Sequence, residues 1–491
     1  MNSLALLIDF GSTFTKVTAV DLDESRIVGR GQAPSTVETD VGEGLLHALD
    51  RLRQCDPIFG DGPMGLDALG GTHVRACSSA AGGLRIVVAG LVPGLTVEAA
   101  NAAALGAGGK VVGAFGFKLG EDDIGEIIGL KPDMIMLTGG TDGGDTQTIS
   151  HNAAMLARTP LPVPFVVAGN SAVSAEVRET IAAAGKEVRC ADNVMPEMNK
   201  LSPASAQKEI RRLFMRRIVD GKGLDRIKAR VPVVLPTPLA VLKAAFLGSQ
   251  GNQEEPGCGD LLLVDVGGAT TDVYSIGEGK QRGKDIIPRG LPEPFAKRTV
   301  EGDLGLRFNA MTILDRVGAE FLYAEFQAGF PEHRISCADL LAYVQAVSEE
   351  TGRVPTEDWQ SAIDAVMARI AVNLAIERHA GRRELYHSSG GTVFLQSGKD
   401  LTETSTLIGT GGIFTHNPYA DRILASQARA NGRYEVLRPA DPRILLDQDY
   451  ILYAVGLLAD SHPMVALRIF QKQFGSERRQ TPGRIGEKGR T

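Results

Sequence analysis

Two short apolar runs flank a polar, glycine-bearing turn near the start of the chain, and the same pattern returns in its second half. The runs cover residues 4–9 and 16–20, and then residues 261–265 and 272–276. Apolar, β-branched runs on either side of such a turn are typical of a β-hairpin. Aligned on Asp9 and Asp265, both hairpins read Leu-Leu-x-Asp-x-Gly. We therefore expect each hairpin to begin one lobe of a two-lobed molecule with a cleft between the lobes.

The segment between the two hairpins has a different hydrophobic rhythm, in which short buried strands alternate with helices. The expected strands cover residues 84–91, 110–117, 132–139, 163–170 and 186–192, and the helices between them include 96–108, 146–158 and 172–185. This alternation is typical of a doubly wound parallel sheet. The sequence therefore predicts an α/β fold in which a flavodoxin-like domain is inserted into the first lobe.

These patterns divide the chain into five segments. Residues 1–71 are expected to form the first part of the first lobe and residues 196–250 its second part, with the inserted domain at 72–195. A Gly-rich loop after residue 248 marks a natural boundary, and the second lobe is expected over 258–474. The basic segment 475–491 has the composition of a disordered tail.

Composition narrows the class of protein. The 491 residues are 43% hydrophobic and 23% charged, which is ordinary for a globular protein, and the net charge of −7 gives no basic footprint for general nucleic-acid binding. The five cysteines are scattered, which disfavours disulfides, structural zinc and iron–sulfur clusters and fits a reducing cytosol. Without a run of about 20 apolar residues or a secretion signal, we expect a cytoplasmic protein that does not span a membrane.

The two turns have the chemistry of phosphate-binding loops. A glycine lets the backbone approach a ligand closely, and successive N–H groups can surround phosphate oxygens. The residues expected to do so are Gly11, Ser12 and Thr13 in the first turn, and Gly267, Gly268, Ala269, Thr270, Thr271 and Asp272 in the second. Either turn alone could be an ordinary hairpin turn. Two matching turns that face each other across a cleft could clamp a triphosphate.

Carboxylates beside phosphates need a cation between them. Asp9 and Asp265 end the first strand of each hairpin, so we expect them to bind Mg²⁺, which proteins hold through waters and one or two carboxylates. Lys16 is expected to neutralise charge that develops on the transferred phosphoryl group. Either Asp265 or Asp272 would orient an attacking water. Asp9, Asp265 and Lys16 are therefore the predicted catalytic residues.

A third glycine-rich segment, residues 407–418, reads LIGTGGIFTHNP. A strand that leads into Gly409, Thr410, Gly411 and Gly412 could lie flat against a base or ribose, because glycines leave room for a ligand. Alone, this segment would be an ordinary glycine-rich loop. Its place after the two hairpins favours a nucleotide site.

These motifs resemble those of a known superfamily. The turn at residues 9–16, the helix PTPLAVLKAAFLG, the turn DVGGATTD and the late GTGG are similar to the phosphate, connecting and adenosine motifs of the actin/hexokinase/Hsp70 ATPases. The resemblance implies a two-lobed actin-like (ribonuclease H-like) fold with ATP and Mg²⁺ between the lobes. It also implies that Glu301 contacts the ribose or adenine, where the alternative is a solvated helix cap.

The sequence over most of the chain resembles one family within that superfamily. Stretches such as CSSAAGGLRIVVAGLVPGLTVEAANAAALGAG, PDMIMLTGGTDGGD and VDVGGATTDVYSI are similar to the glutamate mutase (methylaspartate mutase) accessory proteins, called MutL and unrelated to the mismatch-repair protein of that name. The resemblance covers nearly all of residues 1–460. It implies an ATP-binding and ATP-hydrolysing reactivating chaperone, which exchanges damaged cobalamin for intact cofactor and has the subunits of an adenosylcobalamin-dependent mutase as partners.

Two alternatives stay open at this point. A small-molecule kinase of the same superfamily would also bind ATP between two lobes, and it would need a catalytic base and a substrate pocket. The inserted domain resembles cobalamin-binding mutase domains, but its first loop, GLVPGLTVEAAN, has no histidine to ligate cobalt. It could imitate the cobalamin subunit, although a generic insertion used for stability or dimerisation is favoured, because fold similarity alone is weak evidence of function.

Overall fold

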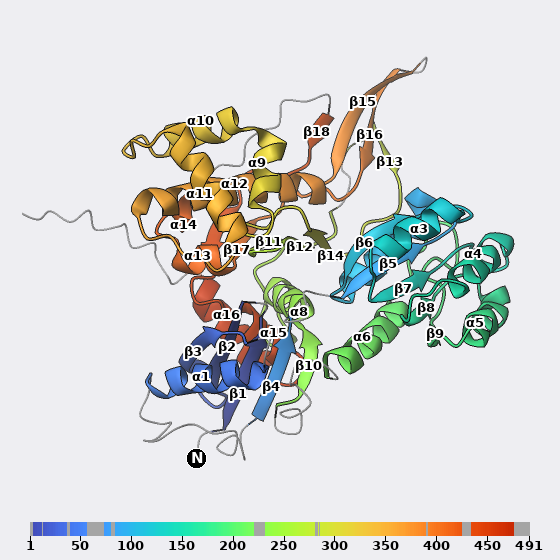
Figure 1. Cartoon of the computed structure of the whole chain (residues 1–491), viewed down its shortest axis with the longest axis horizontal. Coiled ribbons are helices and arrows are strands. Elements are labelled where there is room, and N and C mark those ends of the chain that lie inside the picture. Colours follow the sequence, from blue (N-terminus) through green and yellow to red (C-terminus); the bar gives the residue numbers. More distant parts are fainter. Residues whose placement is uncertain are drawn as a thin grey trace, which may run out of the picture.

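The computed structural model describes residues 3–11, 13–36, 40–55, 73–79, 84–219, 231–279, 283, 285–388, 391–424 and 434–475. Within these residues the chain forms two mixed five-stranded sheets, a parallel five-stranded sheet and a four-stranded sheet, with helices around them (Figure 1). The expected tail from residue 476 onward lies outside the described residues, as does Ser12 of the first turn. In the described part of the chain, no helix has the length and apolar character needed to cross a bilayer.

The first hairpin is the centre of one mixed sheet. The strand order is β10-β4-β1-β2-β3, in which β1 and β2 form the expected hairpin and β3 continues it antiparallel. On the other side of β1, strands β4 and β10 run parallel to it. The strands are β1 (Leu4–Phe10), β2 (Phe14–Asp21), β3 (Arg26–Pro34), β4 (His73–Ser78) and β10 (Val233–Pro236), and helix α1 (Val41–Arg53) packs on β2 and β3.

The second hairpin is the centre of a sheet with the same topology. Its order is β14-β12-β11-β17-β19, again with three antiparallel strands followed by two parallel ones. Both hairpins predicted from the hydrophobic pattern are therefore confirmed. The strands are β11 (Leu261–Val266), β12 (Thr271–Ile276), β14 (Ala296–Glu301), β17 (Thr406–Thr410) and β19 (Arg443–Leu446). The accompanying helices are α9 (Ala310–Val317), α10 (Ala319–Gly329), α11 (Cys337–Glu349), α12 (Asp358–His379), α13 (Gly412–His416) and α14 (Ala420–Leu424).

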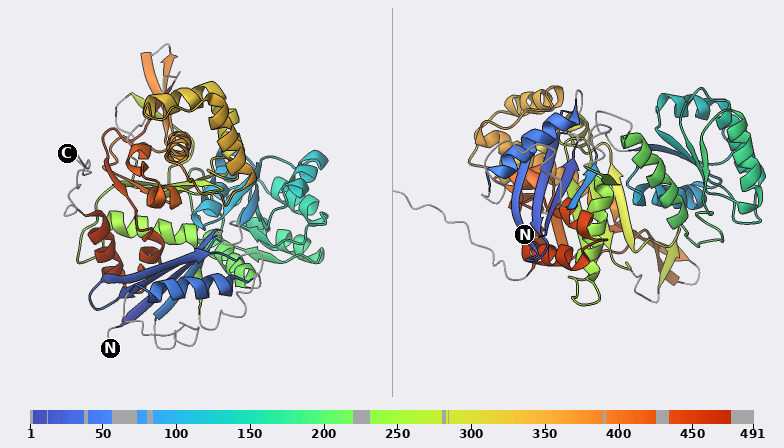
Figure 2. Two further views of the ribbon diagram at one scale, coloured as in Figure 1. Left: turned by 60° about the vertical axis from the view of Figure 1, so that its left-hand side comes forward. Right: turned by 90° about the horizontal axis from the view of Figure 1, so that it is seen from below.

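A layer of helices fills the space between the two mixed sheets, as Figures 1 and 2 show. Its apolar core joins Leu7 of the first sheet to Leu263 of the second. Two of the helices cross so closely that a Cβ at Gly456 would lie 1.8 Å from the carbonyl oxygen of Ala240. The helices are α8 (Thr237–Gln250), α15 (Leu452–Leu458) and α16 (Pro463–Phe474).

The parallel sheet stands beside the two mixed sheets, as Figures 1 and 2 show. Its order is β6-β5-β7-β8-β9, so its first strand lies between its second and third. The alternation of strands and helices predicted for this segment is confirmed. The strands are β5 (Arg85–Ala89), β6 (Lys110–Phe115), β7 (Met134–Leu137), β8 (Phe165–Val167) and β9 (Val188–Cys190), with helices α2 (Glu98–Gly106), α3 (Glu121–Gly129), α4 (Gln147–Ala157) and α5 (Ser174–Ala183). We call residues 84–195 the insertion.

Strand β4 corrects the expected start of the inserted domain at residue 72. It lies in the first mixed sheet, between β1 and β10, and the parallel sheet begins only with β5. The pairing of β4 with β1 is long-range and parallel, so the local sequence carries no signal for it. Helix α6 (Ala204–Val219) then leads from the insertion back to β10.

A small sheet that the hydrophobic pattern did not predict projects from the second mixed sheet in Figure 1. Its order is β13-β16-β15-β18. The strands are β13 (Ile286–Arg289), β15 (Arg382–Ser388), β16 (Gly391–Ser397) and β18 (Tyr434–Val436).

The crossing of α8 and α15 generates the first prediction. Gly456→Ala should lower the free energy of unfolding by about 1–3 kcal/mol, because the new methyl group overlaps a backbone carbonyl that cannot rotate away. Urea denaturation of both proteins measures the difference. Gly125→Ala, on the exposed side of α3 where a Cβ meets nothing within 4 Å, is the matched control and should be neutral or stabilising. Equal effects of the two changes would contradict the close crossing.

Candidate functional site

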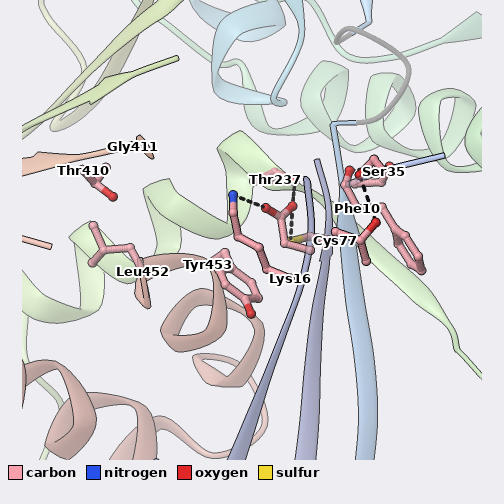
Figure 3. A network of polar contacts seen from close by, with 12 residues as sticks. Phe10, Lys16, Ser35, Cys77, Thr237, Thr410, Gly411, Leu452 and Tyr453 are labelled. Atoms are coloured by element: carbon pink, nitrogen blue, oxygen red, sulfur yellow. Dashed lines mark hydrogen bonds and ion pairs between the residues drawn. The ribbon is translucent and has the colours of Figure 1, made fainter. Parts of the chain in front are cut away.

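The carboxylate of Asp9 is the centre of the first half of the site. Asp9 lies near the end of β1 with 1% of its surface exposed. The Thr237 hydroxyl, at the start of α8, donates to Asp9 Oδ1 at 2.6 Å, and the Cys77 thiol of β4 donates to the same oxygen at 3.5 Å. The Lys16 ammonium lies 3.6 Å from Asp9 Oδ2. Figure 3 shows Lys16, Thr237 and Cys77 converging from three elements, so this buried charge is paired and hydrogen-bonded.

Tyr450 contacts the other side of Lys16. The Lys16 ammonium lies 3.5 Å from the centroid of the Tyr450 ring, in a cation–π contact. Tyr450 follows β19 and has a φ of 50°, a left-handed conformation that is strained for an aromatic residue. Burial raises the pKa of Tyr450 well above its usual value, and the carboxylates of Asp265 and Asp9 raise it further. Lys16 is thus positioned between a carboxylate and an aromatic ring.

The two turns close in the same way. The Gly11 N–H donates to the carbonyl of Phe14 at 3.1 Å, and the Gly267 N–H donates to the carbonyl of Thr270 at 2.9 Å. Residues 306–308, in the loop after β14, donate three more backbone hydrogen bonds to carbonyls of the second turn. The second turn is therefore held in one conformation before any ligand binds, as a preorganised site requires.

Asp265 and Asp272 face each other across the second hairpin but have different partners. Arg298 donates from Nε and Nη2 to Asp272 Oδ1 at 2.9 and 2.6 Å, and the Thr270 hydroxyl donates to Asp272 Oδ2 at 3.1 Å. Among the described residues, none donates a hydrogen bond to the side-chain carboxylate of Asp265 or forms an ion pair with it. Burial and, next, Asp272 raise the pKa of Asp265 to about 7, while Lys16 lowers it. Asp265 is therefore the carboxylate available to a ligand.

The third motif packs directly against Asp265. Strand β17 runs parallel to β11, and Thr410 is the register partner of Asp265. Gly411 has a φ of 108°, and a Cβ there would lie 2.9 Å from Asp265 Oδ1. Only glycine fits both the backbone conformation and the contact. Gly409 lies within β17, and Gly412 is the first residue of α13. The motif therefore passes from strand to helix beside the second hairpin.

Asp447, which the sequence did not point to, fixes the third motif in place. The Thr410 hydroxyl donates to Asp447 Oδ2 at 2.9 Å, and the N–H groups of Ile451 and Leu452 donate to its two oxygens at 3.0 and 3.3 Å. Burial raises the pKa of Asp447 to about 6, and these hydrogen bonds lower it. Asp447 therefore links β17 to the start of α15, and Tyr450 lies in the same turn.

Glu301 ends β14 beside the second turn, where it is the register partner of Thr271. It does not cap a helix, because α9 begins only at residue 310. Arg378 of α12 forms an ion pair with Glu301 and donates to Asp303 Oδ1 at 2.7 Å. Burial raises the pKa of Glu301, while the hydrogen bond from Arg378 lowers that of Asp303. A contact between Glu301 and a ribose or adenine stays a prediction.

The carboxylates of the candidate site suit a Mg²⁺ ion that is held mainly by water molecules and by phosphate oxygens of a ligand. Within the described residues, no three His, Cys, Asp or Glu side chains are grouped to hold a metal ion by themselves. Mg²⁺ is usually bound by one or two carboxylates together with waters and phosphate oxygens. Asp265 offers such a carboxylate, and Asp9 a second one whose Oδ2 faces Lys16. The two predicted metal ligands therefore fit Mg²⁺ with a phosphate ligand.

The structure brings together most of the residues singled out from the sequence. Asp9, Lys16 and Asp265 lie within electrostatic range of one another, and Figure 3 shows Thr410 and Gly411 across from Lys16. The residues that sequence reasoning missed are Cys77, Thr237, Arg298, Arg378, Asp447 and Tyr450. Thr237 lies in the helix motif PTPLAVLKAAFLG, and Asp447 also had a usable signal, as an aspartate a few residues before a helix.

The bond between Thr237 and Asp9 generates the second prediction. Thr237→Val removes the donor closest to a buried carboxylate and should cost about 1–3 kcal/mol of unfolding free energy. Thr180→Val is the control, because the Thr180 hydroxyl of α5 only donates back to its own helix at 3.0 Å, and such a surface change should stay within about 0.5 kcal/mol. Denaturant titration measures both, and an equal small effect would show that Asp9 does not depend on Thr237.

Comparison with solved structures gives distant likenesses. A nucleotide-free acetone carboxylase structure, described as ATP-dependent, is similar over 94% of this chain and 70% of its own, with 13% identity and a TM-score of 0.42. A glycerol dehydratase reactivase is similar over 93% of this chain and 99% of its own, with 10% identity and a TM-score of 0.27. Likenesses this distant carry no argument about function.

Comparison of sequences is decisive for the family. Protein MutL of Clostridium tetanomorphum is 40% identical over 473 residues, which cover 95% of this chain and 98% of that protein. The family model described as MutL protein matches residues 5–474. The match includes both hairpins, the insertion and the third motif. The chain belongs to the MutL protein family.

Proposed function

We propose that this protein binds and hydrolyses Mg²⁺-ATP between its two mixed sheets, as an accessory protein that reactivates an adenosylcobalamin-dependent mutase of the glutamate mutase type. The observation that carries the proposal is the contrast among the carboxylates. Asp9 and Asp272 are neutralised by neighbours, whereas Asp265 is free and faces Lys16 between two glycine-bearing turns. A site that crowds carboxylates around one lysine suits a ligand that brings both phosphates and a divalent cation.

Each residue has a defined task in this proposal. The N–H groups of the two turns would bind the phosphates, and the third motif with Glu301 would hold the nucleoside. Lys16, held by Asp9 and Tyr450, would face the γ-phosphoryl group and offset charge that develops there. Asp265 would orient the attacking water and accept its proton. Bound Mg²⁺ would neutralise phosphate charge.

The insertion is proposed to be a flavodoxin-like domain, with residues 196–250 returning to the first lobe and 258–474 forming the second. The strand order β6-β5-β7-β8-β9, all parallel, supports this, since it is the flavodoxin-like order. The loop after β5 contains no histidine, so the insertion would not ligate cobalt through one.

The decisive experiment measures ATP hydrolysis with and without a cobalamin-inactivated mutase, followed by mutase activity. The proposal expects phosphate release without any metabolite acceptor, stimulation by the inactivated mutase, and recovery of mutase activity that requires ATP and is lost on chelation of Mg²⁺. Transfer of the γ-phosphate to a small molecule would favour a kinase of this fold instead. Absence of both stimulation and recovery with every adenosylcobalamin mutase tested would refute the reactivase function.

Asp265 generates a prediction of its own. Asp265→Asn keeps the size of the side chain but removes the charge that would orient water, so hydrolysis should fall by at least about 100-fold, the usual contribution of a general base, while nucleotide binding changes little. Single-turnover assays and equilibrium binding separate the two effects. Asp315→Asn, an exposed carboxylate on α9, is the control and should behave as wild type. Unchanged turnover in Asp265→Asn would show that another carboxylate does this work.

A further inference from the structure

The turn that joins α2 to β6 in the insertion touches both halves of the candidate site. This turn, residues 105–110, lies at the end of α2, where the last carbonyls of a helix have no further helical turn to accept from. Within the turn, the Gly108 N–H donates to the Leu105 carbonyl at 3.0 Å. Its neighbours belong to β14 in the second mixed sheet and to the start of α8, beside the first. Neither of these neighbours belongs to the parallel sheet that contains β6.

On the side of the second sheet, one guanidinium group bridges the turn and the site. Arg298 of β14 donates from Nη1 to the carbonyls of Leu105 and Gly109 at 3.0 and 2.8 Å. The same guanidinium donates twice to Asp272, through Nε and Nη2. Only 3% of the Arg298 side chain is exposed. Arg298 therefore caps the end of α2 with the group that also neutralises Asp272, so neither end of the bridge can move far without the other.

On the side of the first sheet, the turn is wedged against the residue before Thr237. Gly108 has a φ of 93°, and a Cβ there would lie 2.9 Å from Cβ of Pro236. Pro236 ends β10, and Thr237, which follows it, donates to Asp9. The turn therefore packs against the residue that precedes Thr237, the hydrogen-bond donor to the Asp9 carboxylate.

Electrostatic contacts continue along the same interface. Lys110 at the start of β6 lies against Gly302, where a Cβ would come 2.6 Å from the ammonium nitrogen. Burial lowers the pKa of Lys110 and Arg85 lowers it further, while Asp272 and Asp303 raise it. The insertion is therefore packed along β14 and does not hang free on its connections.

We propose that the α2–β6 turn couples the insertion to the nucleotide site, with Arg298 as the positioning residue on one side and Gly108 on the other. This inference rests on the proposed nucleotide site but not on the identity of the mutase. A nucleotide that binds to both hairpin turns would act on the elements that carry Asp9 and Asp272. The α2–β6 turn contacts Arg298, which pairs with Asp272, and Pro236, which precedes the Asp9 partner Thr237. Coupling of this kind is reciprocal, so a partner on the insertion would change nucleotide affinity by the same factor.

The first test follows nucleotide-dependent amide hydrogen exchange in the whole protein. In wild type, Mg²⁺-ADP should slow exchange at residues 98–115 of the insertion as well as at the two hairpin turns. Arg298→Lys keeps the charge but loses the planar fork that reaches both partners, so the response at 98–115 should disappear while that at the turns remains. Arg438→Lys is the matched control, because the partners of Arg438 among the described residues are Glu377 and Asn373, both in the second lobe, and it should respond as wild type.

The second test approaches the coupling from the insertion. Gly108→Ala should change the dissociation constant of Mg²⁺-ADP by about fivefold or more, the lower end of typical coupling between sites. Gly185→Ala is matched in residue, domain and backbone, with a φ of 76°, but a Cβ there meets nothing within 4 Å. It should leave nucleotide affinity unchanged, because it touches neither lobe.

The outcomes separate this inference from the proposed function. Nucleotide binding that slows exchange at the turns but not at 98–115, or equal effects of Gly108→Ala and Gly185→Ala on affinity, would overturn the coupling and leave the ATP site standing. Complete failure of wild type to bind Mg²⁺-nucleotide would refute the ATP site and the coupling together. If Arg298→Lys abolishes nucleotide binding altogether, the comparison of Gly108→Ala with Gly185→Ala decides whether the coupling exists.

Discussion

Burial of negative charge in the two hairpins is the constraint on which the candidate site depends. A buried carboxylate is costly unless it is paired and hydrogen-bonded. Asp9 meets this requirement through Thr237 and Lys16, and Asp272 meets it through Arg298. Each of these partners comes from a different element, so helix α8 and strands β2 and β14 are all held by the same requirement. Asp265 is left without such a partner among the described residues, so its carboxylate is the one that a ligand would have to satisfy.

The duplicated sheets show how one local design can serve two tasks. Both hairpins place an acidic residue at the end of the central strand and close their turns with the same backbone hydrogen bond. They differ in the residue that opposes this acidic side chain, because Lys16 opposes Asp9 but Asp272 opposes Asp265. The first hairpin therefore supplies a cation and the second a carboxylate. In the proposed nucleotide site, these complementary halves would suit a ligand that carries both phosphates and a metal ion.

The insertion packs against both mixed sheets, and its described contacts do not include the carboxylate of Asp265. Its apolar face shares a core with the first sheet, where Ile86 and Ala100 pack in the same cluster as Ile8. Its bond to the second sheet is polar and passes through Arg298. A continuous apolar core is rigid, and the Arg298 guanidinium ties the end of α2 to Asp272. The insertion is therefore attached to the first sheet by apolar packing and to the second through this polar bridge.

Local patterns in the sequence determined the hairpins, their turns, the third motif and the alternating strands and helices of the insertion, because two-residue periodicity, glycine and acidic turn residues act within a few positions of each other. Tertiary structure alone decided that β4 pairs with β1, that Asp447 anchors Thr410, and that Tyr450 lies under Lys16. It also decided which carboxylate stays free. These choices depend on contacts between residues far apart in the chain, and their energies come from burial, which no local pattern encodes.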